Sequence, residues 1–355
     1  MASPLAKIGI ISIGDMGVGL AKLLVAHGFA VATNVTGRSA DTVERARTAQ
    51  VELLPSDEAL ARSCSVILSV VPPRDAVATA QRIVDAVAGP AAVRRTDADP
   101  PLYFADLNAV APSSVKKIAA LFSGSRDAGA SSVRFVDGSI LGGPPSPKAE
   151  ADSSASSSSS TVSTPAPPAS GENDDDTIAA TWNRPSIPTS GPHKLADVPA
   201  FGARLAATLN MRHVSADVGA ASGLKMCFAS FSKGFTSLAI QSFTTAHRLG
   251  ILPDLQAELR TVLGPHYRLA SKGVVGMAPK AYRWVGEMEE IARTLSEEGG
   301  FAPDSFVGAA KVYRTVADDT VLGLEKIGKR KRGTTVEDVA AAMAEGMQTK
   351  RKKDE

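Results

Sequence analysis

The sequence predicts an α/β fold in which a doubly wound parallel sheet is followed by an all-α C-terminal domain. In the first half of the chain, short aliphatic runs alternate with helical stretches, as in parallel sheets whose strands are joined by crossover helices. After residue 195 the spacing of apolar residues is almost entirely helical. The 355 residues, 44% of them hydrophobic, are enough for two domains with separate cores.

Each predicted strand is a short aliphatic run, and each predicted helix repeats apolar residues three and four positions apart. In the first half we expect strands at 7–13, 30–36, 65–71, 102–106 and 133–137, helices at 17–27, 40–49, 74–88 and 112–122, and a proline-bounded surface excursion at 91–101. In the second half we expect helices at 196–209, 219–249, 253–263, 279–298, 303–318 and 335–346, with one strand at 211–214.

The first predicted strand leads directly into a glycine turn. Ser12-x-Gly14-x-x-Gly17 follows that strand and opens an apolar helix, the context in which G-x-G-x-x-G binds a dinucleotide. Ser12 stands where the first glycine usually lies. Gly14 lets the backbone approach a pyrophosphate, and Gly17 lets the helix pack on the strand. We therefore predict a Rossmann-type domain whose cofactor-binding residues include Ser12, Ile13, Gly14, Asp15, Met16 and Gly17.

The residues at the end of the second predicted strand indicate whether NAD or NADP binds. NAD enzymes tend to place an acid there for the ribose 2′-hydroxyl, whereas this sequence has Arg38 and Ser39. Arg38 can bind a 2′-phosphate through two hydrogen bonds, and Ser39 can donate a third. An ordinary surface arginine is the alternative. The sequence favours NADP over NAD.

Composition changes abruptly between residues 144 and 191, where serine, proline and aspartate dominate. Such a segment buries too little apolar surface to offset the entropy of ordering it. We predict a dinucleotide-binding domain at 1–215 with a disordered insertion at 144–191, an all-α domain at 216–325, and a basic tail at 326–355.

Composition also excludes several classes of protein. Cys64 and Cys227 are too few for a disulfide framework, and the five histidines are scattered without metal-ligand spacing. The chain has no apolar run of membrane-spanning length, and its early first strand leaves no room for a signal peptide. The run of four basic residues at 329–332 is better explained as a solvated tail than as a nucleic-acid patch. A cytoplasmic protein that binds neither membrane nor nucleic acid is expected.

Five motifs occur in a fixed order. They are Gly9-x-x-Ser12-x-Gly14-x-Met16-Gly17, Ser69-Val70-Val71-Pro72-Pro73, Asp106-Leu107-Asn108, the run 137–143, and Gly219 followed six residues later by Lys225. The series resembles the β-hydroxyacid dehydrogenases, whose superfamily also contains 6-phosphogluconate dehydrogenase. The run 280–291 resembles a smaller branch that carries a short phosphogluconate-dehydrogenase-like C-terminal domain.

The resemblance implies roles for particular residues. The loop of Val70, Val71 and Pro72 would border the cofactor ribose and nicotinamide together with Asn108, although a rigid strand exit explains the prolines equally well. The family's catalytic lysine falls on Lys225. An unpaired ammonium in the surrounding apolar helix would be costly, and burial of that kind lowers a lysine pKa toward the range needed for acid–base work. A snorkelling structural lysine is the alternative.

Departures from the family pattern lie around the substrate. Ala229 stands where the family has asparagine, and Phe228-Ala229 replaces the His-Asn of true phosphogluconate dehydrogenases, so strict decarboxylating activity is doubtful. Leu141 replaces the substrate-loop serine. Backbone N–H groups and nearby polar side chains are then left to bind substrate, and the candidates are Gly142, Gly143, Ser222, Ser232 and Lys233.

We therefore expect an NADP-dependent oxidoreductase that interconverts a small β-hydroxy acid, or a related hydroxy compound, with its carbonyl form. Lys225 would act as general acid and base, and a homodimer would form through the helical domain. One alternative is an NADPH-dependent ketone or imine reductase, suggested by the apolar replacements. Another is a non-catalytic NADP-binding regulatory protein, suggested by the same replacements, the insertion and the tail.

Overall fold

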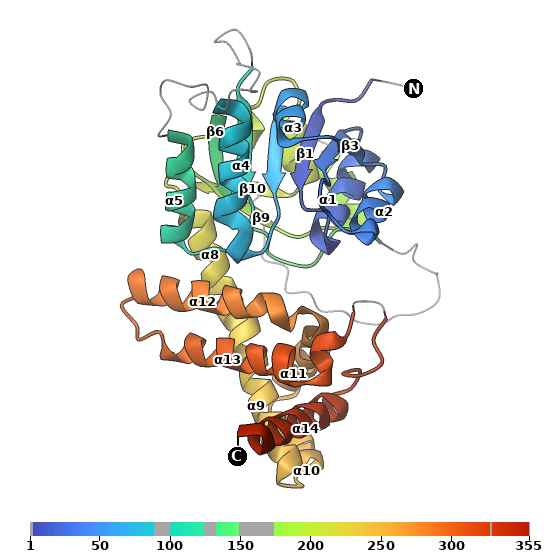
Figure 1. Cartoon of the computed structure of the whole chain (residues 1–355), viewed down its shortest axis with the longest axis vertical. Helices are drawn as coiled ribbons and strands as arrows, with labels where there is room; N and C mark the ends of the chain where they lie inside the picture. Colours follow the sequence, from blue (N-terminus) through green and yellow to red (C-terminus); the bar gives the residue numbers. More distant parts are fainter. Residues whose placement is uncertain (1–2, 89–99, 124–132, 149–173, 327–328, 355) are drawn as a thin grey trace. The chain divides into compact units, whose positions relative to one another are not determined.

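The computed structural model describes residues 3–88, 100–123, 133–148, 174–326 and 329–354. These residues form two compact units (Figure 1). The first unit comprises Met1–Val70, Thr79–Leu107 and Leu121–Ala216, and the second comprises Val71–Ala78, Asn108–Ala120 and Asp217–Glu355. Among the described helices, none is both long and apolar enough to cross a membrane.

The first unit is built on an eight-stranded sheet in the order β10-β9-β6-β5-β4-β1-β2-β3. Neighbouring strands are parallel except for the antiparallel pair β6 and β9. The strands are β1 Lys7–Ile11, β2 Ala30–Asn34, β3 Glu52–Leu54, β4 Val66–Ser69, β5 Leu102–Asp106, β6 Val133–Gly138, β9 Ile187–Ser190 and β10 Met211–Ser215. Along the chain, the helices between these strands are α1 Asp15–Ala26, α2 Ala40–Thr48, α3 Asp57–Ser63, η1 Pro73–Asp75, α4 Ala76–Ala88, α5 Pro112–Ser123, η3 Leu195–Asp197 and α7 Gly202–Thr208. Of these, η1 and most of α5 belong to the second unit.

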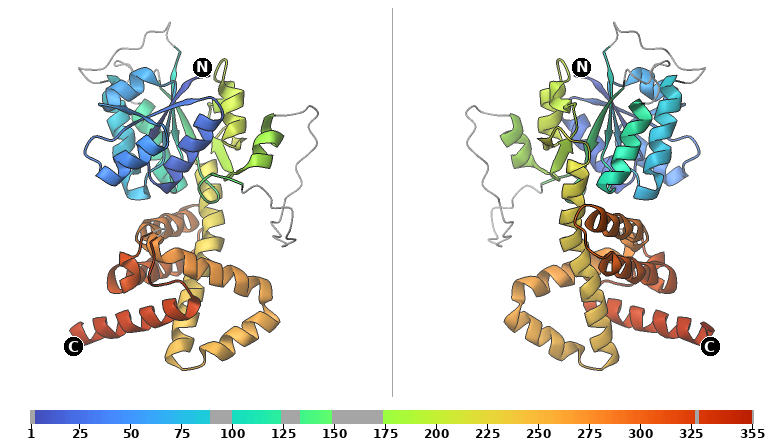
Figure 2. Two further views of the ribbon diagram at one scale, coloured as in Figure 1. Left: turned by 90° about the vertical axis from the view of Figure 1, so that its right-hand side faces the viewer. Right: turned by 90° about the vertical axis from the view of Figure 1, so that its left-hand side faces the viewer.

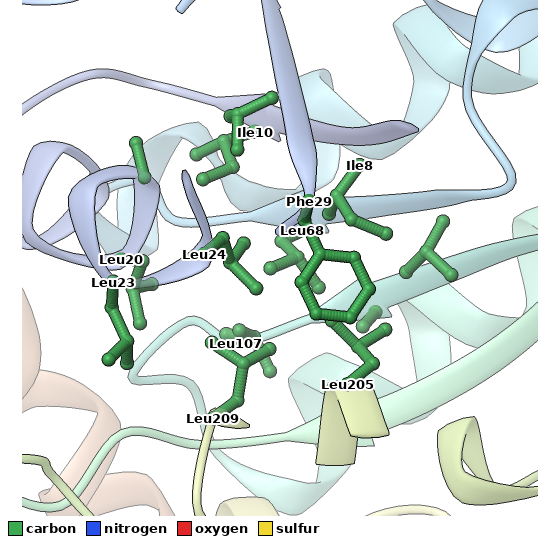
Figure 3. Packing of buried hydrophobic residues seen from close by; sticks show 14 of the residues in the cluster. Ile8, Ile10, Leu20, Leu23, Leu24, Phe29, Leu68, Leu107, Leu205 and Leu209 are labelled. Carbon is green, nitrogen blue, oxygen red and sulfur yellow. The ribbon is translucent and has the colours of Figure 1, made fainter. Parts of the chain in front are cut away.

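Alternation along β1 determines which residues reach each face of the sheet. Ile8 and Ile10 are fully buried in the core shared with α1 and α7, where Leu24 and Leu205 meet them (Figure 3). Gly9 points to the opposite face, where an added Cβ would press on side chains of β4 and α3. Because both faces are covered, the strands read as continuous aliphatic runs, which is why the sequence pattern identified most of them.

The second unit is helical in its C-terminal part. It contains α8 Ala220–Ala229, the π-helical turn η4 Ser230–Gly234, α9 Phe235–Arg248, α10 Leu252–Val262, α11 Gly264–Met277, η5 Ala278–Lys280, α12 Ala281–Glu297, α13 Asp304–Asp319, η6 Val321–Leu324 and α14 Val336–Asp354. Figure 2 shows α8, η4 and α9 running as one continuous helix, as predicted for 219–249. The predicted α/β sheet followed by an all-α domain is therefore confirmed.

The insertion predicted at 144–191 is a point of difference. Residues 149–173 lie outside the described residues, but the flanking stretches have regular structure: β7 Ser146–Pro147 pairs with β8 Trp182–Asn183, and α6 Asp174–Thr181 precedes β8. In β9, the Ser190 hydroxyl donates to the buried Asp137 carboxylate of β6 at 2.7 Å. The described parts of the predicted insertion, at 144–148 and 174–191, therefore contain regular structure instead of the predicted disorder, whereas the prediction for 149–173 lies outside the described residues.

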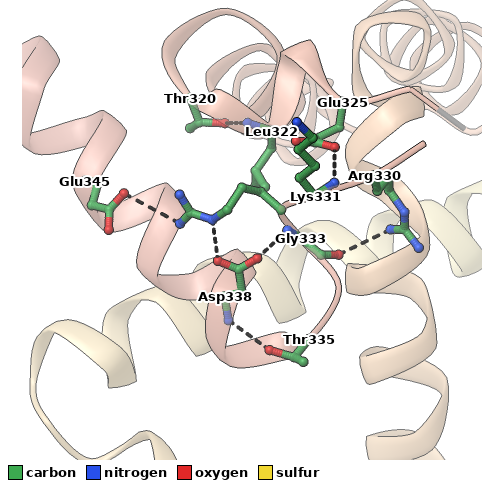
Figure 4. A network of polar contacts seen from close by, with 10 residues as sticks. Thr320, Leu322, Glu325, Arg330, Lys331, Gly333, Thr335, Asp338 and Glu345 are labelled. Carbon is green, nitrogen blue, oxygen red and sulfur yellow. Dashed lines mark hydrogen bonds and ion pairs between the residues drawn. The ribbon is translucent and has the colours of Figure 1, made fainter.

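The basic tail predicted at 326–355 is also corrected. Val339 and Met343 of α14 are buried in the helical core. In the preceding run, Arg332 Nε donates to Asp338 at 2.7 Å, and Arg330 donates to the Gly333 carbonyl oxygen at 3.2 Å (Figure 4). These cations are held by contacts within the chain rather than solvated as a free tail.

Other differences concern short or interrupted elements. The helix expected at 196–209 is divided into η3 and α7, and the sequence analysis missed β3, α3 and α11. Gly264 and Pro265 directly follow the helix predicted at 253–263, but proline is compatible with the first turn of a helix, and α11 begins there. Most of the excursion predicted at 91–101 lies outside the described residues.

Candidate active site

The glycine turn between β1 and α1 has the geometry of a phosphate-binding turn. A Cβ at Gly17 would clash with the carbonyl oxygen of Ser12, so only glycine fits there. Gly14 is the N-cap of α1 and no side chain caps the helix, while the nearest atom to a Cβ at Gly14 is Ser12 Oγ at 3.9 Å. The first amides of α1 therefore lie beside open space, which suits an anion.

Ser12 itself has an unusual backbone conformation, with a φ of 79°. That region costs a residue with a Cβ about 1 kcal/mol or more relative to glycine. At the position of the first glycine of the usual pattern, serine thus adopts a backbone conformation that favours glycine. Asp15 and Met16 form the first turn of α1, and Met16 packs against the core of the sheet.

A pocket of about 100 Å³ joins the glycine turn to the end of β2. It is lined by Ser12, Ile13, Gly14, Thr33, Asn34, Val35, Arg38, Thr42 and Arg45. Predicted cofactor residues from both motifs therefore share one pocket. Ser39 is the N-cap of α2, and its hydroxyl lies 3.1 Å from that of Thr42.

Arg45 and Thr42 are pocket residues that the sequence analysis missed. Arg45 Nε donates to the Ile13 carbonyl oxygen at 3.2 Å, and its Nη2 donates to the Thr42 hydroxyl at 3.1 Å. Arg45 therefore links α2 to the glycine turn and brings a second guanidinium beside Arg38. The available signal was spacing, because Ser39, Thr42 and Arg45 recur every three residues on the predicted helix.

The loop residues named by the family resemblance are joined by a hydrogen bond in the second unit. The Val71 N–H donates to Asn108 Oδ1 at 2.6 Å, and Asn108 is buried. Pro72 precedes η1, while Val70 ends the first unit and its N–H donates to the Ile11 carbonyl oxygen of β1. The amide of Asn108 thus fixes the chain that leaves β4.

Glu290 of α12 holds the start of α5, just after the Asn108 loop. Its Oε2 accepts from the Ala111 N–H at 2.7 Å and from the Ser114 hydroxyl at 2.8 Å. Arg293 donates to its Oε1 at 2.9 Å. A helix leaves its first N–H groups without intrahelical partners, and a carboxylate from another helix satisfies one of them here.

Lys225 lies on α8, whose first turn packs against the same loop. A Cβ at Gly219 or at Gly223 would contact Pro112, the first residue of α5. Burial, with a contribution from the charge of Arg283, lowers the pKa of Lys225 to about 8. The second unit therefore brings the predicted catalytic lysine and the Asn108 loop to neighbouring elements.

Lys233, predicted as a substrate ligand, has partners within the protein. Its ammonium pairs with the Glu287 carboxylate and lies 5.1 Å from the ring centroid of Trp284. Burial lowers the pKa of Lys233, and the charges of Lys225, Arg283 and Lys280 add to that effect.

The remaining predicted substrate residues are spread over the chain. Ser222 is buried in α8, whereas Ser232 lies in the π-helical turn and its hydroxyl donates at 3.4 Å to the Phe228 carbonyl oxygen. Gly142 and Gly143 belong to the first unit and are exposed. Gly142 has a φ of 133°, which suits glycine.

Two family matches cover separate stretches of the chain. Residues 7–93 match the family described as "NADP oxidoreductase coenzyme F420-dependent", and residues 246–316 match a "Domain of unknown function (DUF1932)". The first stretch contains the glycine turn, Arg38 and Ser39, and its description agrees with the predicted NADP cofactor. Among curated proteins, no sequence matches this chain.

Solved structures match most of the chain. A 3-hydroxyisobutyrate dehydrogenase from Salmonella typhimurium is 15% identical with a TM-score of 0.58, over 95% of this chain and 99% of that one. The 3-hydroxyisobutyrate dehydrogenase of Mycobacterium tuberculosis, solved with L-serine, is 16% identical with a TM-score of 0.55, over 95% and 98%. The conserved protein MTH1747, of unknown function and described as similar to 3-hydroxyacid dehydrogenases, is 24% identical with a TM-score of 0.53, over 88% and 97%.

The chain has the fold of the 3-hydroxyacid dehydrogenases. The predicted resemblance is thereby confirmed. The chain combines this fold with a stretch at 7–93 that matches NADP oxidoreductases, which supports an NADP-dependent oxidoreductase.

Proposed function

We propose that this protein is an NADP-dependent oxidoreductase that interconverts a small β-hydroxy acid and its carbonyl form, with Lys225 as general acid and base. The observation that carries the proposal is Lys225 itself, on α8 beside the Asn108 loop, with a pKa lowered to about 8. A group with a pKa near working pH exchanges a proton efficiently in either direction.

The residues that line the pocket between the glycine turn and the end of β2 suit the phosphate groups of NADP. No side chain caps α1 at Gly14, and the pocket that Gly14 lines is also lined by Arg38, Arg45 and Thr42. We propose that the turn from Ser12 to Gly17 binds the pyrophosphate and that Arg38 and Ser39 bind the 2′-phosphate. When bound, NADP supplies the hydride acceptor or donor. Val70, Val71, Pro72 and Asn108 would border its nicotinamide half.

The chemistry assigned to the chain is a proton transfer. In oxidation, the hydroxyl O–H bond breaks as its proton passes to Lys225 Nζ, while the adjacent C–H bond gives up a hydride. In reduction, Lys225 returns the proton to the carbonyl oxygen as that carbon receives the hydride. The same lysine serves both directions because its charged and neutral forms are both populated near pH 8.

Replacing Lys225 tests this assignment. We expect Lys225→Met to lower turnover by about 10² to 10⁴-fold, the usual worth of a general acid or base, and to leave NADPH affinity unchanged. Lys272→Met, an exposed lysine of α11, is the matched control and retains turnover. The assay uses a panel of β-hydroxy acids and the corresponding aldehydes as substrates and measures turnover by the absorbance of NADPH. Full turnover in Lys225→Met would refute the proposed role.

We further propose that the protein forms a homodimer through its long helix. Four exposed apolar residues, Leu224, Phe228, Phe231 and Leu238, lie along α8, η4 and α9, and we call them the apolar stripe. Phe228, Phe231 and Leu238 are 49%, 83% and 64% exposed. Large aromatic and aliphatic side chains gathered in one stripe mark an interaction surface, and a second copy of the stripe is its simplest complement.

Light scattering after size-exclusion chromatography tests the dimer. We expect the wild type at twice the chain mass of 36.7 kDa, and the double variant Phe231→Glu, Leu238→Glu at the single-chain mass. Leu324→Glu, at an exposed leucine outside the stripe, should remain dimeric. A monomeric wild type, or a double variant that stays dimeric, contradicts the proposal.

A further inference from the structure

Basic side chains gather around Lys225 in the helical unit. The charges of Lys225, Lys280 and Arg283 all act on Lys233, and Arg283 acts on Lys225 in turn. These residues come from α8, η4, η5 and the start of α12. Bringing four cations together is unfavourable unless negative charge is close by.

Three carboxylates of α12 have partners other than Arg283. Glu287 pairs with Lys233, and Glu289 accepts from Arg314 at 2.9 Å. Glu290 accepts from the start of α5 and from Arg293. Three acids of one helix therefore go to three different partners, and among the described residues none of these hydrogen bonds or ion pairs involves Arg283.

Arg283 is left without an acceptor among the described residues. Its Nε atom is buried and makes no hydrogen bond. A buried donor without a partner costs about 1–3 kcal/mol, and more when it belongs to a charged group. Arg293, ten residues further along the same helix, shows the usual arrangement, in which a guanidinium donates to a carboxylate. An oxyanion from outside the chain would satisfy Arg283.

We propose that Arg283 binds the carboxylate of the substrate and so selects hydroxy acids over neutral alcohols and ketones. This inference rests on the proposed function, because it places the acid group beside Lys225. A guanidinium presents two parallel N–H groups that match the two oxygens of a carboxylate. It would also supply the polar contact that Ala229 and Leu141 cannot provide.

The chemistry of Arg283 is recognition of an oxyanion, and two sources are available: the substrate carboxylate and a phosphate of the cofactor. The phosphate groups have their own pocket at the glycine turn, Arg38 and Arg45. The carboxylate is therefore the source to which we commit, and the experiment separates the two.

Isothermal titration of the full chain tests the proposal. Malonate is the anionic probe and malonamide its neutral counterpart, both added with NADP at saturation. We expect malonate to bind the wild type, Arg283→Gln to weaken that binding by at least tenfold, and Arg283→Lys to weaken it less. Malonamide should bind poorly to all variants. Arg314→Gln is the matched control, since it removes an exposed arginine that pairs with α12, and it should bind malonate as the wild type does.

Each other outcome overturns the proposal. Equal malonate affinity in Arg283→Gln and wild type, or no malonate binding by the wild type, removes the carboxylate site. Loss of NADP affinity in Arg283→Gln, in a protein whose circular dichroism and melting temperature are unchanged, assigns the arginine to a cofactor phosphate. The proposed function fails separately: Lys225→Met with full turnover would refute the acid–base role while the malonate result still stands.

Discussion

At the scale of single residues, Ser12 adopts a backbone conformation that is unfavourable for a residue with a Cβ atom. Its φ of 79° is the conformation for which glycine is suited, and the usual fingerprint has glycine there. We expect Ser12→Gly to raise the free energy of unfolding by about 1 kcal/mol, because it removes this strain. Thermal unfolding measures the change. A lower melting temperature would show that a contact of the Ser12 side chain outweighs the strain.

Arg45 should contribute to cofactor choice. Arg45 lines the same pocket as Arg38. We therefore expect Arg45→Gln to weaken NADPH binding by about tenfold, because one charge-assisted contact is lost, and to leave NADH binding nearly unchanged. Arg47→Gln, an exposed arginine of the same helix outside the pocket, is the matched control. Fluorescence titration with both nucleotides gives the ratio, and an equal loss for NADPH and NADH would assign Arg45 to the turn alone.

The lowered pKa of Lys225 predicts opposite pH profiles for the two directions. Oxidation needs the neutral amine as base, so kcat/KM should rise with pH and level off above about 8. Reduction needs the ammonium as acid, so kcat/KM should fall above about 8. Since the charge of Arg283 helps to lower this pKa, Arg283→Gln should move both limbs to higher pH. Stopped-flow rates across pH 6–10 test it, and a profile with no limb near 8 would contradict it.

At the scale of elements, α12 acts as a support for the Asn108 loop. Glu290 accepts hydrogen bonds from the Ala111 N–H, just before α5, and from the Ser114 hydroxyl, and its side chain is 13% exposed. We expect Glu290→Gln to lower the free energy of unfolding by about 1–3 kcal/mol, since a neutral amide is a weaker acceptor and leaves the Arg293 charge unpaired. Glu289→Gln, at an exposed pair, should change it by less than about 1 kcal/mol. Denaturant unfolding compares the two, and equal effects would contradict this role.

The sequence could predict the elements whose signals are local. The runs that became β1, β2, β4, β5 and β6 are apolar over most of their length, and the glycine turn follows one of them directly. In contrast, Ile187–Ser190 is a buried strand made partly of polar residues. Its Ser190 is satisfied by Asp137, more than fifty residues earlier, and no local pattern contains that information.

Some residues of the candidate site could likewise be predicted from the sequence, and others could not. Gly14, Gly17 and Arg38 could be named because backbone geometry and strand position dictate their residue types. Arg283 could not be named, since its importance depends on which partners Glu287, Glu289 and Glu290 take from distant helices. Arg283 stands out only in the folded chain, where its buried Nε atom lacks a hydrogen-bond acceptor among the described residues.

At the scale of the whole molecule, the helices of the second unit are joined by one hydrophobic core. Buried residues of α9, α11, α12, α13 and α14 share one core, so the C-terminal stretch at 336–354 belongs to the folded body. The stripe of Phe228, Phe231 and Leu238 is the part of the long helix that this core leaves exposed. The long helix is therefore buried on the side that meets this core, and its exposed stripe is the surface that a second copy would cover in the proposed dimer.

The π-helical turn at Ser230–Gly234 sets the rotational phase of everything that follows it. Each residue of an α-helix advances the chain by about 100° around the axis, so deleting one residue from this turn would rotate α9 by about that angle relative to α8. Phe243, now buried, would turn away from the core, and the exposed Leu238 would move toward it. The extra residue thus lets one uninterrupted helix present the Lys225 face at one end and a differently oriented core face at the other.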